Sequence, residues 1–114
     1  GEFIFKERLK LNENNYEYLY KIAIAQILQR NSKDASITLE KLLSIDKSNA
    51  NLYLAKSIVD IYNFNPNKAS FSIKNSEKFN KNKDLISSIE TVKLLSELIN
   101  FKFKAIIQRI FINI

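Results

Sequence analysis

Few residues of this sequence are able to do acid–base, nucleophilic or metal chemistry. The 114 residues include no His and no Cys, which removes the commonest general base, the best nucleophile and the usual ligands of zinc, haem and iron–sulfur clusters. The single Gly excludes a glycine-rich phosphate cradle. The acidic residues are scattered and form neither a paired-carboxylate nor a calcium-loop spacing; they include Asp34, Asp46, Asp60 and Asp84. We therefore expect no enzyme activity, no catalytic residue, no metal and no cofactor.

Positive charge is the next feature that suggests a partner. The sequence has 18 Lys+Arg against 12 Asp+Glu, and helical spacing places Lys74, Lys78 and Lys81 on one face. Such a basic face either contacts nucleic acid, an acidic protein or anionic lipid, or is a solvated outer face. Nucleic acid is not expected as the partner of this face, because nucleic-acid sites usually interleave Arg and aromatic residues with Lys and Arg is scarce here.

The near absence of Gly and Pro favours long helices in one all-α domain. The spacing of apolar residues predicts helices over about 16–30, 33–44, 50–62, 66–80 and 84–113. Asn14 or Asn15 is expected to cap the first helix and Ser32 the second. Pro66 suits the first turn of the fourth helix. The last stretch is either one long helix or two helices that break near Asn100.

The C-terminal stretch from Leu94 is apolar on most sides, and the candidates for an apolar contact surface on it are Phe101, Phe103, Ile107 and Phe111. A helix of this kind must be covered on most sides. The cover is either the rest of this domain, residues downstream of it, a second copy of the chain, or another protein. The stretch also carries Glu97, Lys102, Lys104 and Arg109, so we expect no transmembrane segment.

An internal repeat is visible in the small residues. Ala35 and Ala69 lie 34 residues apart, and each is followed four residues later by a large apolar residue, Leu39 or Ile73. Ile22-Ala23 in one helix corresponds to Leu54-Ala55 in another. This pattern resembles the tetratricopeptide repeat (TPR) family, about two repeats plus a C-terminal helix. The resemblance implies antiparallel helix pairs stacked in a right-handed array of about five or six helices.

The repeats are expected over 12–48 and 49–83, with 84–114 as a degenerate third repeat or a capping helix. First-helix residues fall 32 apart and second-helix residues 34 apart, which predicts about two extra residues in the turn at 62–67. Residues 1–11 are expected to be a lead-in or short helix. Gly1-Glu2-Phe3 resembles a cloning remnant, so the chain is expected to be a piece of a longer protein, either cytoplasmic or from a bacterial cell envelope.

The resemblance also implies a partner-binding groove lined by the first helix of each pair. Tyr20, Ile24 and Ile27 would line it in the first repeat, and Lys56 and Val59 in the second. The alternative is that Ile24 and Ile27 pack inside the domain. The Lys and Asn of the family's chaperone-tail clamp are replaced here by Tyr20 and Ile24, so that activity is not supported.

These patterns predict a non-catalytic protein–protein interaction module that binds another protein or a peptide. The partner segment would lie in the groove or against the apolar C-terminal helix. The alternatives are a basic helical domain that binds nucleic acid and a self-associating helical bundle that forms a homo-oligomer.

Overall fold

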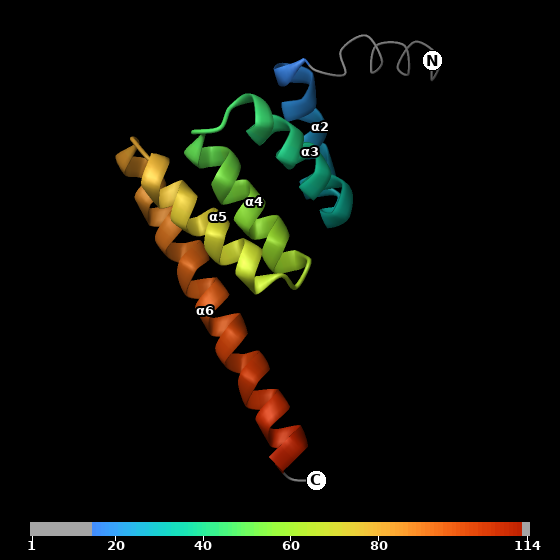
Figure 1. Cartoon of the computed structure of the whole chain (residues 1–114), viewed down its shortest axis with the longest axis vertical. Helices are drawn as coiled ribbons and strands as arrows, with labels where there is room; N and C mark the ends of the chain where they lie inside the picture. Colours follow the sequence, from blue (N-terminus) through green and yellow to red (C-terminus); the bar gives the residue numbers. More distant parts are fainter. Residues whose placement is uncertain (1–14, 113–114) are drawn as a thin grey trace.

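A computed structural model describes residues 15–112, and this part of the chain is all-α with five helices and no strand. This confirms the expected fold class. The helices are α2 (Tyr16–Leu28), α3 (Ser32–Ile45), α4 (Ala50–Tyr62), α5 (Pro66–Phe79) and α6 (Lys83–Ile112). Consecutive helices pack against each other, and α6 contacts both α5 and α4 (Figure 1). The predicted lead-in, the tag remnant and Asn113–Ile114 lie outside the described residues.

Asparagine starts each of the four shorter helices. The side-chain oxygens of Asn15, Asn31, Asn49 and Asn65 each accept a hydrogen bond from the backbone N–H three residues later, which satisfies a donor that has no partner within the helix. The prediction of Ser32 as a cap is wrong. Ser32 is the first residue of α3, and its hydroxyl donates instead to the Oδ1 of Asn63 at 2.6 Å.

The helix boundaries repeat with a constant offset. The first and last residues of α2, 16 and 28, recur in α4 as 50 and 62, and those of α3, 32 and 45, recur in α5 as 66 and 79. The offset is 34 residues at all four positions, so the predicted offset of 32 in the first helices is wrong, and the turn at 62–67 has no extra residues.

The buried small residue equivalent to Ala23 is therefore Ser57, not Ala55. Ser57 is as buried as Ala23, and its hydroxyl donates to the backbone oxygen of Leu54 at 2.6 Å. A serine whose hydroxyl is satisfied within its own helix occupies little more space than an alanine. The alignment of the two internal repeats matched Ala23 with Ala55, which placed the first helices of the repeats two residues out of register.

The core consists of two apolar clusters that share α4. One joins α2, α3 and α4 through residues that include Leu19, Leu39 and Leu52. The other joins α4, α5 and α6 through Leu54, Ile73, Ile89 and Val92. Because α4 contributes to both clusters, it connects the two halves of the bundle.

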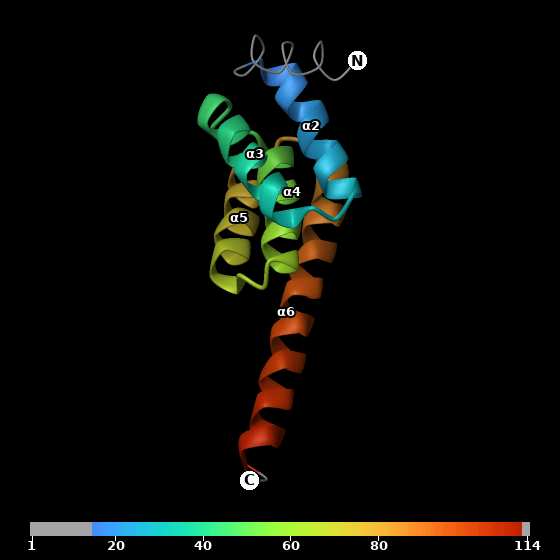
Figure 2. The same cartoon turned by 90° about the vertical axis from the view of Figure 1, so that its right-hand side faces the viewer.

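The last helix is continuous over all 30 of its residues, so no break occurs near Asn100. Its first half lies against α4 and α5, and its second half extends past the end of the bundle (Figures 1 and 2). The molecule is accordingly elongated, with principal extents of 58 × 35 × 19 Å.

Candidate interaction surface

The projecting part of α6 leaves a large apolar surface uncovered. We call residues 98–112 the distal half of α6. Every residue from Phe101 to Ile112 is exposed, and the last two buried residues of the helix are Ile89 and Val92. The exposed large apolar side chains of the distal half are Leu98, Ile99, Phe101, Phe103, Ile106, Ile107, Ile110, Phe111 and Ile112. A contiguous exposed apolar surface on a folded domain usually marks a contact site.

The four C-terminal residues predicted for contact all lie on this surface. Phe101 and Phe111 are 70% exposed, Phe103 is 62% exposed and Ile107 is 37% exposed. At 100° per residue, Phe103 and Ile107 lie near the face that continues from Ile89, whereas Phe101 lies on the opposite side. The exposed aromatic residues are therefore distributed around the helix and not along a single line.

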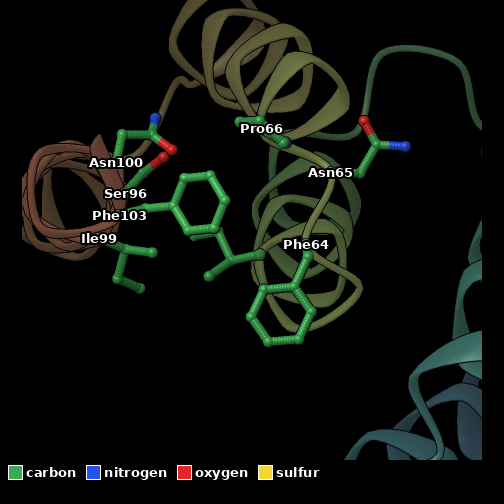
Figure 3. A pocket seen from close by; sticks show the side chains of 8 residues that line it. Phe64, Asn65, Pro66, Ser96, Ile99, Asn100 and Phe103 are labelled. Carbon is green, nitrogen blue, oxygen red and sulfur yellow. The ribbon is translucent and has the colours of Figure 1, made fainter. Parts of the chain in front are cut away.

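A hollow between α6 and the α4–α5 turn adjoins the distal half. Its lining comes from Ile61, Phe64, Asn65 and Pro66 at the turn and from Ser96, Ile99, Asn100 and Phe103 on α6. Figure 3 shows the Phe103 ring extending from α6 toward the turn, with the Phe64 ring beside it. The hollow thus joins an exposed helix to the end of the folded bundle.

Phe64 is held in this position by the way α4 ends. Its φ is +55°, the left-handed region that bulky residues rarely adopt. The N–H of Phe64 donates to the oxygen of Ile61 and the N–H of Asn65 to the oxygen of Asp60, the hydrogen-bond pair of a Schellman motif. Arg30 closes α2 in the same way with φ +59°. The sequence analysis missed Phe64, and its 34-residue separation from Arg30 was the available signal.

The predicted groove is only partly present. Tyr20 and Ile24 are exposed on α2, and Ile27 is half-buried against the first core cluster. Val59 is 2% exposed, so it lines no surface groove and its part of the prediction is wrong. Lys56 is 5% exposed and borders a depression with Tyr53 and Phe71, whose lining includes neither Tyr20 nor Ile24, so the predicted residues do not share one groove. Val59 instead fills the first core cluster.

Lys56 is buried because α4 itself supplies its counter-charge. The Lys56 ammonium lies 2.6 Å from Oδ1 of Asp60, one turn further along the helix, and 3.8 Å from Oε1 of Glu40 on α3. The other Asp60 oxygen accepts from the Ser72 hydroxyl of α5 at 3.1 Å. This network joins α3, α4 and α5. Lys56, which its charge alone would place at the surface, therefore belongs to the interior of the bundle.

The predicted basic face is exposed but not uniformly basic. Lys74, Lys78 and Lys81 are all exposed. Lys81 lies beyond the end of α5 at Phe79, so the prediction that it shares a helix face with the other two is wrong. Lys78 lies over the Phe79 ring, 5.2 Å from its centroid. Lys74 shares a shallow depression with Glu77, Lys93 and Glu97, and Lys93 pairs with Glu77 at 3.6 Å. The acidic neighbours reduce the positive potential over this face.

A polar cluster ties α2 to the α3–α4 connection. The Tyr16 hydroxyl donates to Oδ2 of Asp46 at 3.2 Å, and Asn49 donates to both of them. Burial raises the pKa of the Tyr16 hydroxyl above its ordinary value of 10.0, and the neighbouring Asp46 charge raises it further. The protonated hydroxyl thus donates the hydrogen bond that links α2 to Asp46.

Within residues 15–112, no group of three or more carboxylates is arranged to hold a metal ion. None of the helices described is long and apolar enough to cross a membrane.

Comparisons with family models, curated proteins and solved structures found no match to this chain.

Proposed function

We propose that this chain is a non-catalytic protein-interaction module built of TPR-like helix pairs. In this proposal the partner binds along the distal half of α6 and in the hollow beside the α4–α5 turn. The observation that carries the proposal is the exposure of the distal half, in which nine large apolar side chains are uncovered on a continuous helix.

The energetics of burial favour a protein partner of this surface. Full burial of a Phe or Ile side chain contributes about 1.5–3 kcal/mol, and a few central aromatic anchors usually supply most of the affinity of an interface. Phe101, Phe103 and Phe111 are available as such anchors because they are exposed.

The repeat geometry supports the array part of the proposal. Helix boundaries that recur every 34 residues have the period of TPR helix pairs. In such an array the exposed face of the last helix is where the next element would stack.

Co-purification from an extract of the source cells tests the proposal. The full chain is compared with the Phe103→Glu/Ile107→Glu variant, which places two charges beside the hollow. The matched control is Phe71→Glu, because Phe71 is equally exposed but lies on α5. We expect a stoichiometric protein with the parent chain and with Phe71→Glu, and its loss with the double variant.

Two further variants separate the alternatives. Tyr20→Glu/Ile24→Glu alters the exposed residues of α2; if only this variant loses the partner, the site on α6 is wrong and the α2 groove is the site. Binding of generic DNA or RNA that falls steeply with salt, and that is lost on Lys74→Glu/Lys78→Glu, would replace the proposal by a nucleic-acid function.

A further inference from the structure

The distal half of α6 carries the same packing line as the half that is already packed. Apolar and small residues recur along the whole helix at alternating intervals of four and three residues. They are Leu85, Ile89, Val92, Ser96, Ile99, Phe103, Ile106 and Ile110. We call this line the seam. An alternation of this kind is the pattern of a helix that packs lengthwise against another helix.

The environment of the seam changes halfway along it. Ile89 and Val92 are buried against α4 and α5, with Leu85 partly buried beside them. Phe103, Ile106 and Ile110 continue the line but are exposed. Because the spacing does not change where the cover ends, the exposed part of the seam has the form of a site for one more helix.

The hollow fixes where that helix would begin. Ile99 and Phe103 belong both to the seam and to the hollow, whose other wall is Ile61, Phe64 and Pro66. A helix laid along the seam from the hollow to Ile110 would cover about 16 Å, at 1.5 Å per residue. Its first anchoring side chain would fill the hollow, whose lining side chains are drawn in Figure 3.

The charges beside the seam select the partner. Residues 98–112 contain Lys102, Lys104 and Arg109 and no acidic residue. Lys102 and Arg109 are two turns apart and flank the seam on the same side. Two copies of the chain that met antiparallel along this seam would bring these like charges together, whereas an acidic helix would pair with them in either direction. The alternation of four and three residues also favours a helix over a lipid surface, which requires only a broad apolar face.

We propose that the occupant of the seam is an amphipathic helix of another protein, with an apolar stripe flanked by acidic residues. This proposal rests on the proposed function, because it specifies the partner of the same surface. The partner helix would place an apolar anchor in the hollow and its carboxylates opposite Lys102 and Arg109.

Two synthetic helical peptides test the charge selection with the full chain. Both carry the same single Leu stripe; one has Glu at the flanking positions and the other has Lys. We expect the Glu peptide to bind the parent chain about tenfold more tightly than the Lys peptide at moderate salt. The preference should reverse in Lys102→Glu/Arg109→Glu and persist in the control Lys74→Glu/Lys78→Glu.

An Ile106→Glu substitution tests the seam itself. Its side chain is exposed, so the bundle should fold normally, as circular dichroism would verify, while both peptides lose affinity. Equal affinity for the two peptides, or no reversal in the charge variant, overturns the proposal.

The other occupants are measured under the same conditions. A dimeric mass in light scattering that returns to monomer with Ile106→Glu would assign the seam to a second copy. Binding to anionic phospholipid vesicles together with no peptide binding would assign it to a membrane surface. One further outcome is that co-purification recovers a partner whose binding requires Phe103 and Ile107 while the Glu and Lys peptides bind with equal affinity. In that case the proposed function stands and only the acidic-helix inference fails.

Discussion

At the residue scale, the least expected feature is the charge inside the bundle. Lys56 and Asp60 are both buried, and Ser72 and Glu40 extend their pairing to the neighbouring helices. A buried ion pair contributes little net stability, because desolvation of the two charges offsets their attraction. Removal of one partner is costly, since the other charge then remains buried without compensation. The sequence offers only the i, i+4 spacing of Lys56 and Asp60 as a signal, and that spacing is equally common on solvated faces.

We predict that Asp60→Ala lowers the free energy of unfolding by about 3–5 kcal/mol. The double variant Lys56→Met/Asp60→Leu should be close to the parent chain, because it removes both charges and retains most of the volume. Urea denaturation monitored by circular dichroism measures both values. The control is Lys93→Met, which breaks the half-exposed pair with Glu77 and should cost less than about 1 kcal/mol. A small effect of Asp60→Ala would contradict the buried pairing.

Tyr16 gives the stability a dependence on alkaline pH. Its pKa is raised above 10.0 in the folded chain by burial and by Asp46, so the folded state holds the phenolic proton more tightly than the unfolded state. The stabilisation of the folded state by the protonated Tyr16 hydroxyl is complete below pH 10. It is lost as the pH rises through the raised pKa of Tyr16 in the folded chain. We expect Tyr16→Phe to remove this decline, measured as the difference in unfolding free energy from the parent between pH 8 and pH 11. Tyr62→Phe, at an exposed position, should retain the decline of the parent chain.

At the scale of the elements, helix boundaries followed from local chemistry. The predicted range of the third helix matches α4, and the other predicted ends lie within two residues of the observed ones. Asparagine caps, the single Pro and apolar spacing are local signals, and a single sequence carries them. The inward face of α4 was not predictable in the same way, because the burial of Lys56 depends on Glu40 and Ser72, which belong to other helices.

Small residues in the interior set how closely the helices approach, and Ala35 is one of them at full burial. We predict that Ala35→Phe destabilises the fold by about 1–3 kcal/mol, because the new ring must displace the neighbouring side chains. The matched control is Ile37→Phe on the exposed side of the same helix, which should change stability by less than about 0.5 kcal/mol. Equal effects in thermal or urea unfolding would mean that α3 does not pack as described.

The end of α4 allows stability and binding to be separated. We predict that Phe64→Gly raises the unfolding free energy by about 1 kcal/mol, because glycine adopts a φ of +55° without the strain of a side chain. The same change removes a wall of the hollow, so affinity for the partner should fall. Phe64→Ala retains the strain and also removes the ring, so it should lose affinity without the gain in stability. A gain in both properties with Phe64→Gly would exclude a role for this residue in binding.

At the scale of the whole molecule, burial is unequally distributed. The radius of gyration is 16.8 Å, whereas a compact domain of this length would have about 13 Å. The difference reflects α6, of which only the first half joins the core. Apolar spacing predicted this helix and the apolar residues of its second half, but the point at which the bundle ceases to cover it depends on the lengths of α4 and α5 together.

We predict that hydrogen exchange divides α6 into two parts. Amides near Ile89 and Val92 should exchange as slowly as those of α4, because they open only when the bundle opens. Amides between Phe101 and Ile110 should exchange at least about tenfold faster, since few side-chain contacts with the bundle oppose local fraying. Addition of the acidic peptide should slow the second group selectively. Uniform protection along α6 in the free chain would contradict the projecting arrangement.

The continuity of α6 has a geometric consequence for any assembly that contains this chain. A helix with no Gly or Pro between Lys83 and Ile112 resists bending, and from Ser96 to Ile110 it extends about 21 Å at 1.5 Å per residue. A protein bound at the tip of α6 would therefore be held at a fixed distance from a protein bound to α2 and α3. The helix would also fix the rotation of one bound protein relative to the other. Insertion of one residue after Ser96 would turn the whole apolar tip by about 100° relative to the bundle.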